Sequence, residues 1–257
     1  MTLPELVRLG FETDEGFGGR ARIGLIVLET DQTIEAEAQA VVGQLEGVAT
    51  YHSRIAMEAE VTHETLTAMK DRLPTAAALL PQAFAFDAIG YGCTSAATLI
   101  GSEGVAECIE SAHPGVPNTE PITAAITAMH ALGTTRIAIV TPYTAEVTAP
   151  VAKRFTAAGL EVTGLGSFTE SSDLVVARIS PASIAAGVRS IVGQGECDAV
   201  FVSCTSLRVL DIAPALEAEL GVPIVSSNMA LVWHLLRLAG VDDDLAAFGR
   251  LFGCPLP

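Results

Sequence analysis

Residues 87–95 read DAIGYGCTS, and residues 198–206 read DAVFVSCTS. Each stretch is a short apolar run that begins after an aspartate and ends in Cys-Thr-Ser, with the cysteine six residues after the aspartate. Apolar runs of this length, followed by small polar residues, are typical of buried strands in a parallel sheet. Ligands bind beyond the carboxyl ends of such strands, so the sequence predicts that Cys93 and Cys204 each lie at a ligand-binding edge.

The two Cys-Thr-Ser stretches belong to a longer internal repeat. RIGLIV at 22–27 precedes the first stretch and RIAIV at 136–140 precedes the second, while Gly-Val-Pro follows each, at 115–117 and 221–223. A repeat of about a hundred residues is too long for a solenoid and indicates a duplicated domain. Two matched cysteines in two related halves indicate an enzyme that acts on both faces of one small molecule.

Strand and helix patterns alternate along the chain, which predicts an α/β fold. We expect two pseudo-symmetric, flavodoxin-like halves, each a parallel sheet with helices on both faces. The expected strands are 22–28, 48–54, 86–92, 136–141, 160–165, 199–203 and 222–226, and the expected helices are 33–46, 62–80 with an interruption at Pro74, 94–112, 121–132, 147–158, 181–193, 207–220 and 228–240.

The division into halves follows from the repeat. The first half is expected over 1–120 and the second over 121–224, with 225–257 completing the first half because the last helix packs back on it. Residues 1–20 are acidic and glycine-containing and are expected to form an extended arm.

Composition excludes several classes of function. Half of the 257 residues are hydrophobic and 17% are charged, as in compact globular proteins. The net charge of −16 argues against a nucleic-acid partner, because phosphate binding needs clustered Lys and Arg. No stretch has the pattern of a signal peptide, and prolines and glycines break the apolar region 73–102, so no membrane span is expected. We expect a cytoplasmic protein that forms a homo-oligomer.

The other cysteines and the histidines carry weaker signals. The chain has five cysteines without a C-x-x-C pair, which favours reduced thiols. Cys108 and Cys197 have apolar neighbours and are expected to be inert core residues, and Cys254 lies in the tail. Four histidines lack the spacing of metal ligands, so no metal site is expected: His52, His63, His113 and His130.

Thiols at strand ends have a direct use in catalysis. A helix that begins just after each cysteine is expected to lower the pKa of its thiol. One thiolate can then remove a proton from carbon while the opposite thiol returns one on the other face, or a thiolate can add to a double bond and leave after rotation. The small polar residues that follow each cysteine are expected to bind the substrate carboxylate and stabilise developing charge: Thr94, Ser95, Thr205 and Ser206.

Together with VTPY at 140–143 and WHLLRLAG at 233–240, the two cysteine motifs resemble the aspartate/glutamate racemase superfamily, in its maleate cis-trans isomerase and arylmalonate decarboxylase branch. The resemblance implies two α/β domains with the active site between them and no metal or organic cofactor. It places Cys93 and Cys204 at the two catalytic thiol positions, and Tyr143 at that of a tyrosine that holds the substrate carboxylate. The decarboxylase branch keeps only the second thiol, so Cys93 favours an isomerase or racemase.

The loop after the first strand departs from the maleate isomerase pattern. It reads LETDQT at 28–33, and Asp31 stands where those relatives have a substrate-binding asparagine, with Glu29 close by. Two carboxylates would repel a dicarboxylate and would favour a cationic or donor group. The loop resembles that of relatives found in ectoine utilisation, which implies a hydroxyectoine-type compound or an amino acid as substrate. The alternative is that Asp31 only caps the helix that follows, for which Thr33 is also a candidate.

Two classes of function follow. The first is a cofactor-independent isomerase or racemase that uses two cysteines on a small carboxylate substrate, with an arylmalonate-type decarboxylase as the enzymatic alternative. The second is a non-catalytic, two-lobed small-molecule binding protein, which gives no reason for the paired cysteines.

Overall fold

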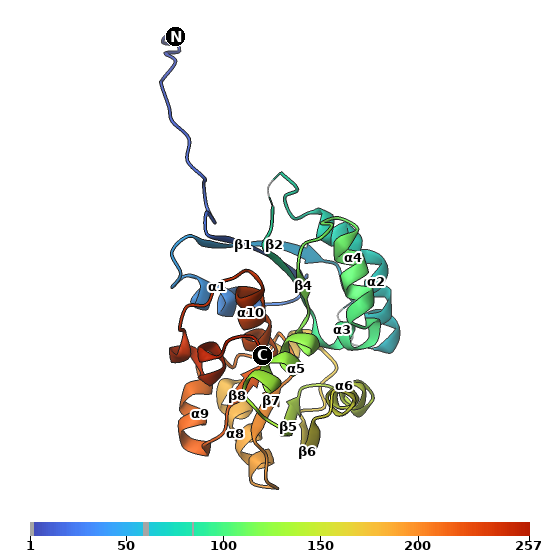
Figure 1. Ribbon diagram of the computed structural model, residues 1–257. Coiled ribbons are helices and arrows are strands. Elements are labelled where there is room, and N and C mark those ends of the chain that lie inside the picture. Colours follow the sequence, from blue (N-terminus) through green and yellow to red (C-terminus); the bar gives the residue numbers. More distant parts are fainter. Residues whose placement is uncertain (1–2, 59–61, 84) are drawn as a thin grey trace.

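The computed structural model describes residues 3–58, 62–83 and 85–257 and contains two parallel sheets of four strands each (Figure 1). Their strand orders, β2-β1-β3-β4 and β6-β5-β7-β8, are the same order repeated. This order matches the first four strands of flavodoxin-like sheets, so the predicted fold class is confirmed. The strands are β1 (Ala21–Leu28), β2 (Val48–Ile55), β3 (Ala88–Gly92), β4 (Asn118–Thr119), β5 (Arg136–Thr141), β6 (Glu161–Ser167), β7 (Ala199–Val202) and β8 (Ile224–Ser226).

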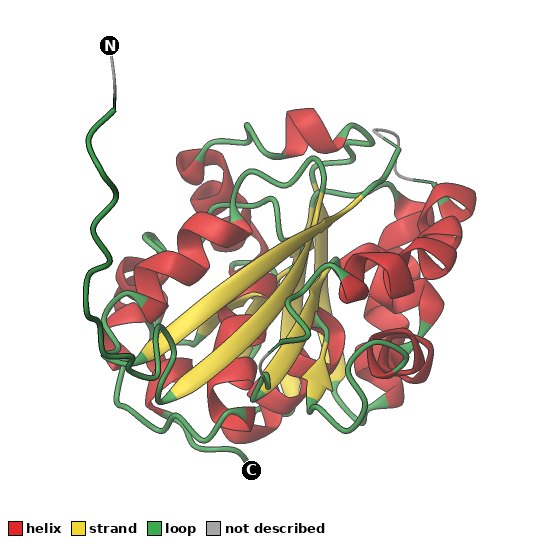
Figure 2. Ribbon diagram, turned by 90° about the horizontal axis from the view of Figure 1, so that it is seen from above, coloured by secondary structure: helices red, strands yellow, loops and turns green. Residues whose placement is uncertain are grey.

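Helices cover the sheets on both sides, as Figure 2 shows from above. The four central strands β1, β3, β5 and β7 are almost wholly buried, which explains their near-continuous apolar sequences. The helices are α1 (Ile34–Val42), α2 (His63–Ala78), α3 (Thr94–Ile100), α4 (Ser102–Glu110), α5 (Pro121–Ala131), α6 (Ala145–Ala157), α7 (Asp173–Val176), α8 (Pro181–Val192), α9 (Ala213–Leu220) and α10 (Ser227–Leu238), followed by the 3₁₀ turns η1 (Ala246–Phe248) and η2 (Arg250–Gly253).

The prediction that the second helix is interrupted at Pro74 was wrong, because α2 continues through it. Proline lacks an N–H, so the carbonyl of Lys70, four residues earlier, loses its partner within the helix. The thiol of Cys108 in α4 donates to that carbonyl, with an Sγ–O distance of 3.6 Å. Another helix therefore supplies a hydrogen bond where proline cannot.

Two further helix boundaries differ from the prediction. The expected helix 94–112 is divided into α3 and α4 at Gly101, whose φ of +83° is a conformation that favours glycine. The helix expected from residue 207 begins only at Ala213. Residues 204–212 instead form a loop, called loop 204–212 below, which starts at the second cysteine.

The last helix returns to the first half, as expected. α10 packs against β3 and α1 as well as α5. Gly90 in β3 permits this close approach, since a Cβ atom there would lie 2.7 Å from Cδ1 of Leu235. The proposed boundaries at 120/121 and 224/225 stay predictions. The contacts of α10 show that residues after the second half pack on the first half.

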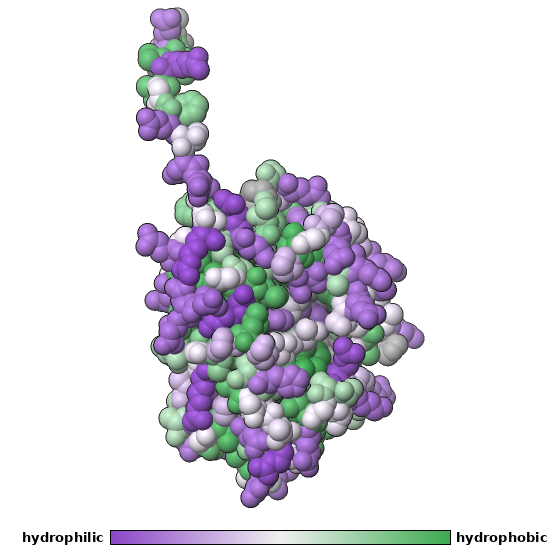
Figure 3. Space-filling view, viewed as in Figure 1, coloured by the Kyte–Doolittle hydropathy of each residue, from purple (hydrophilic) through white to green (hydrophobic). Residues whose placement is uncertain are grey.

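The N-terminal segment projects away from the body as an extended arm, as Figures 1 and 3 show. Residues 3–16 form no helix or strand and are exposed. Among the described residues, none of the helices is long and apolar enough to cross a membrane.

Candidate active site

Cys93 and Cys204 line one small cavity. The structure therefore brings together the two thiols that the repeat singled out. Cys93 follows β3 and Cys204 lies just after β7, so each stands at the carboxyl end of a central strand of its own sheet. The cavity is lined by Leu28, Met57, Leu66, Cys93, Thr94, Ser95, Tyr143, Asp173, Cys204 and Thr205.

Cys93 is the N-terminal cap of α3 and is 2% exposed. The backbone N–H of Ala96 donates to its Sγ at 3.4 Å, and Oγ of Ser95 lies 3.7 Å from the same sulfur. These bonds favour the thiolate, but burial disfavours it more strongly and raises the thiol pKa to about 11. The prediction of a lowered pKa was wrong here, because desolvation outweighs the helix terminus.

Cys204 has a backbone conformation that is rare outside glycine. Its φ is +104°, and it lies at the start of a turn rather than at a helix terminus. Such strain costs about 1–3 kcal/mol and persists only where the surroundings hold it. Its thiol pKa is raised, first by burial and then by the negative charge of Asp173. The predicted lowering of this pKa was also wrong, because α9 begins nine residues later, at Ala213.

A single buried hydroxyl connects the two cysteine motifs. Oγ of Ser227, the first residue of α10, accepts the backbone N–H of Cys204 at 3.0 Å. It also accepts the hydroxyl of Thr94, the residue after Cys93, at 2.8 Å. Ser227 is fully buried, so these bonds are protected from competition by water. The strained residue of one half is thereby tied to the cysteine motif of the other.

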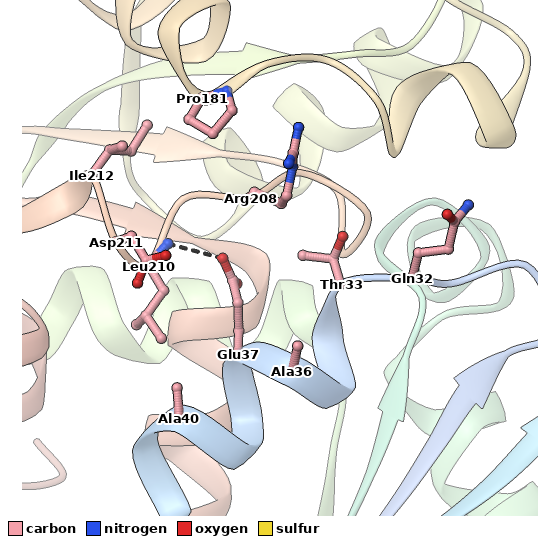
Figure 4. A pocket seen from close by; sticks show the side chains of 10 residues that line it. All are labelled: Gln32, Thr33, Ala36, Glu37, Ala40, Pro181, Arg208, Leu210, Asp211 and Ile212. Atoms are coloured by element: carbon pink, nitrogen blue, oxygen red, sulfur yellow. Dashed lines mark hydrogen bonds between the residues drawn. The ribbon is translucent and has the colours of Figure 1, made fainter.

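Glu37 of α1 holds loop 204–212 from the opposite side, at a surface pocket drawn in Figure 4. Its Oε1 accepts the backbone N–H groups of Val209 and Leu210 at 2.8 and 2.9 Å, and its Oε2 accepts Nδ2 of Asn228 at 2.8 Å. Glu37 thus satisfies two N–H groups of the loop and helps to keep the loop in place after Cys204.

Tyr143 lies in the cavity wall and is 4% exposed, and its predicted role in holding a substrate carboxylate stays a prediction. Burial and the neighbouring cysteines raise the pKa of its hydroxyl well above the usual value, so it acts as a neutral hydrogen-bonding group. Thr94, Ser95 and Thr205 also line the cavity. Ser206 does not, and its hydroxyl is instead bonded to Oδ1 of Asp173 at 3.0 Å.

Asp173 is the site residue that the sequence reasoning missed. It begins the four-residue helix α7, lines the cavity and is 4% exposed. Its Oδ2 accepts the hydroxyl of Thr30 from the first half at 2.5 Å, while its Oδ1 accepts Ser206 from the second half. Its negative charge raises the pKa of both catalytic candidates, Cys93 and Cys204, in addition to their burial.

Asp31 both caps α1 and carries an unpaired oxygen. Its Oδ1 accepts the backbone N–H groups of Thr33 and Ile34 at 2.7 and 2.9 Å, whereas the Thr33 side chain makes no capping bond. Its Oδ2 is buried and has no hydrogen-bond partner among the described residues. The pKa of Asp31 is raised to about 6, mainly by burial. Neither Asp31 nor Glu29 is among the residues that line the cavity, and Glu29 is exposed.

The raised pKa of Asp31 predicts a pH-dependent stability. Its pKa is about 6 in the folded protein and 3.8 in the unfolded reference, so the folded state binds the proton more tightly. The free energy of unfolding should therefore fall as pH rises from about 4 to about 6, by up to about 3 kcal/mol from this residue. Asp31→Asn should abolish that loss and be the more stable protein above the window.

Urea unfolding of the wild type and Asp31→Asn across this range checks the prediction. The difference between the two curves isolates Asp31 from other titrating groups. Curves that remain parallel through the window would show that the carboxylate is not held in an unfavourable environment. Glu161→Gln, at an exposed position of β6, is the matched control and should leave the wild-type curve unchanged.

No group of three or more His, Cys, Asp or Glu side chains is arranged to hold a metal ion in the parts of the chain that the structure describes. The cavity therefore offers thiols, hydroxyls and a carboxylate as its chemical groups.

Two related α/β halves, each of which contributes a cysteine at a strand end to one shared cavity, define a class of small-molecule enzymes. The chain belongs to the arylmalonate decarboxylase family, whose model matches residues 23–252.

The chain is similar to two kinds of enzyme within this family. It is 34% identical to arylmalonate decarboxylase of Bordetella bronchiseptica over 140 residues, which are 54% of this chain and 58% of that protein. It is 26% identical to maleate isomerase of Pseudomonas putida over 241 residues, 90% of this chain and 96% of that protein.

Solved structures give the same result for the fold. Maleate isomerase Iso from Pseudomonas putida S16 superimposes with a TM-score of 0.82 and 26% identity, covering 91% of this chain and 98% of that one. A liganded arylmalonate decarboxylase that carries a Gly-to-Cys and a Cys-to-Ser replacement superimposes with a TM-score of 0.81 and 26% identity, covering 90% and 98%. These relatives are enzymes, which supports the predicted enzyme over the non-catalytic binding protein.

Proposed function

We propose that this protein is a cofactor-independent isomerase that uses Cys93 and Cys204 on a small carboxylate substrate. The observation that carries the proposal is the single cavity lined by both thiols, one from each half. Maleate isomerases match nearly the whole chain, which supports an isomerase. The cytoplasmic location and the homo-oligomeric state stay predictions from the sequence.

The geometry suits transfer of a proton between two faces of one carbon. One cysteine, as thiolate, removes the proton beside the substrate carboxylate, and the electron pair moves into that carboxylate to form an enediolate. The other cysteine, as thiol, returns a proton on the opposite face, so the two residues exchange protonation states in each turnover. The hydroxyls of Ser95 and Tyr143 are available to hold the carboxylate and its developing charge.

For a substrate with a cis double bond, the same pair supports a second route. One thiolate adds to a carbon of the double bond, the resulting single bond rotates, and the thiolate leaves as the trans double bond forms. Racemisation or epimerisation and cis-trans isomerisation are therefore two uses of one site. The resemblance of the 28–33 loop to relatives in ectoine utilisation supports the first use, and this assignment stays a prediction.

Decarboxylation is the second candidate function. The local match to arylmalonate decarboxylase, at 34% identity, favours it. The resemblance implies that the decarboxylase branch keeps only the second thiol, whereas this chain has Cys93 as well. A second thiol in the cavity supports the isomerase over the decarboxylase.

Incubation of candidate acids with the enzyme in D₂O distinguishes these functions. For racemisation or epimerisation, NMR should show loss of the proton beside the carboxylate and chiral chromatography should show inversion. For cis-trans isomerisation, the vinyl proton signals of maleate should be replaced by those of fumarate. Release of CO₂ from a substituted malonate, with no exchange or isomerisation of any other acid, would make the protein a decarboxylase.

A further inference from the structure

The charged group in the cavity wall is an acid. Among the described residues that line the cavity, Asp173 is the one charged residue, and none is Lys, Arg or His. A substrate carboxylate must therefore be held by hydroxyl and backbone N–H groups, with a negative side chain facing the same space. This arrangement is unfavourable for a substrate whose only charges are carboxylates.

Asp173 cannot easily turn away from the cavity. Thr30 donates to one of its oxygens at 2.5 Å and Ser206 donates to the other at 3.0 Å, and the side chain is 4% exposed. The two donors come from different halves of the protein, so they hold the carboxylate across the domain junction. Each carboxylate oxygen can accept a further hydrogen bond, so capacity for a substrate donor remains.

A second buried carboxylate lies next to the same site. Asp31 is 3% exposed, and its Oδ2 makes no hydrogen bond of good geometry among the described residues, although the Thr205 hydroxyl is near enough to lower its pKa. It is close enough to Cys204 and Asp173 to interact electrostatically with both. A buried anionic oxygen without a partner is costly unless a ligand supplies one.

We infer that Asp173, supported by Asp31, selects a small zwitterionic acid, whose ammonium or amidinium group lies beside its carboxylate. This inference rests on the proposed function and specifies its substrate class. The cationic group pairs with Asp173, while the hydroxyl of Ser95 holds the carboxylate. Plain dicarboxylates gain no such pairing and are repelled by both acids.

Binding of matched acids to the wild-type protein tests the inference. The probes are linear and cyclic acids of three to six carbons, in sets whose members differ only at the carbon beside the carboxylate. That carbon carries an ammonium group, a hydroxyl group or two hydrogens. Succinate and maleate serve as plain dicarboxylates. Isothermal titration calorimetry should show at least one ammonium member binding about 100-fold more tightly than its hydrogen counterpart. Tighter binding of a plain dicarboxylate, or no binding of any ammonium member at millimolar concentration, would overturn it.

The Asp173→Asn variant links this preference to the residue. It keeps the shape and removes the charge, so the preference for the ammonium member should fall to less than about tenfold. Asp31→Asn should reduce it less, and it serves as the second variant if Asp173→Asn does not fold. Glu161→Gln removes one exposed charge and should keep the full preference. An unchanged preference in both aspartate variants contradicts the inference.

The proposed function is tested separately in the same protein. Cys93→Ser should keep the preference for the ammonium member, because the cation pairs with Asp173, and should lose turnover. Loss of turnover in Cys93→Ser together with no preference in the wild type would leave the two-thiol enzyme standing and reject the zwitterionic substrate. Full turnover in Cys93→Ser would instead reject the two-thiol function.

Discussion

Replacement of either Cys93 or Cys204 by serine should lower kcat by about a thousand-fold or more, because a hydroxyl is a far weaker acid than a thiol and cannot supply the thiolate. Both side chains line the one cavity, and serine differs from cysteine by a single atom, so the fold should survive. The comparison therefore reports on chemistry rather than on packing.

Solvent exchange separates the roles of the two cysteines. In a two-base racemase, the variant that retains the proton-removing cysteine for one enantiomer should still exchange the substrate proton with D₂O, without inversion. The other variant should show the same behaviour with the opposite enantiomer. Cys254→Ser, in the C-terminal tail, is the control and should keep wild-type activity. A wild-type rate in either active-site variant would remove that cysteine from the mechanism.

Ser227→Ala should lower kcat by about a hundred-fold while KM changes little. Its hydroxyl holds the N–H of Cys204 and the hydroxyl of Thr94, so its loss frees the strained Cys204 to relax away from the reacting position. Small displacements of a catalytic group cost rates of this order. A positioning role predicts this separation of kcat from KM, whereas a global loss of folding would reduce the amount of active protein.

The neighbouring serine provides the control for that experiment. Ser226 is equally buried, and its Oγ accepts the N–H of Met229 as the N-terminal cap of α10. Ser226→Ala should therefore lower the free energy of unfolding by about 1 kcal/mol and leave kcat within a few-fold. If Ser227→Ala behaves like Ser226→Ala in both measurements, the bond to Cys204 has no role in positioning.

The sheets and the cysteine pair were predictable because their signals are local. A buried parallel strand must be apolar on both faces, so DAIGYGCTS and DAVFVSCTS indicate strands without any knowledge of the rest of the chain. Their repetition then placed Cys93 and Cys204 at equivalent strand ends. The structure confirms the fold and brings the two thiols together, while their catalytic use stays a proposal.

The remaining features depend on contacts between distant residues. Residues 207–212 read LRVLDI and were expected to begin a helix, but they form a loop that is bonded to Glu37, more than 170 residues earlier in the chain, at Val209 and Leu210. Asp173 lies in a short, polar segment with no periodic pattern, and its partner Thr30 is 143 residues away in the chain. Burial raises the pKa of both thiols, and a prediction based only on a helix after each cysteine does not take burial into account.

The return of α10 to the first half sets the order in which the protein can be completed during synthesis. The N-terminal half leaves the ribosome first, yet the face of β3 that Leu235 covers stays exposed until α10 has been synthesised. An incomplete sheet with an open apolar face is prone to aggregation and is a target for chaperones. The first half of the nascent chain therefore cannot be completed until α10, which follows the second half in the sequence, has been synthesised.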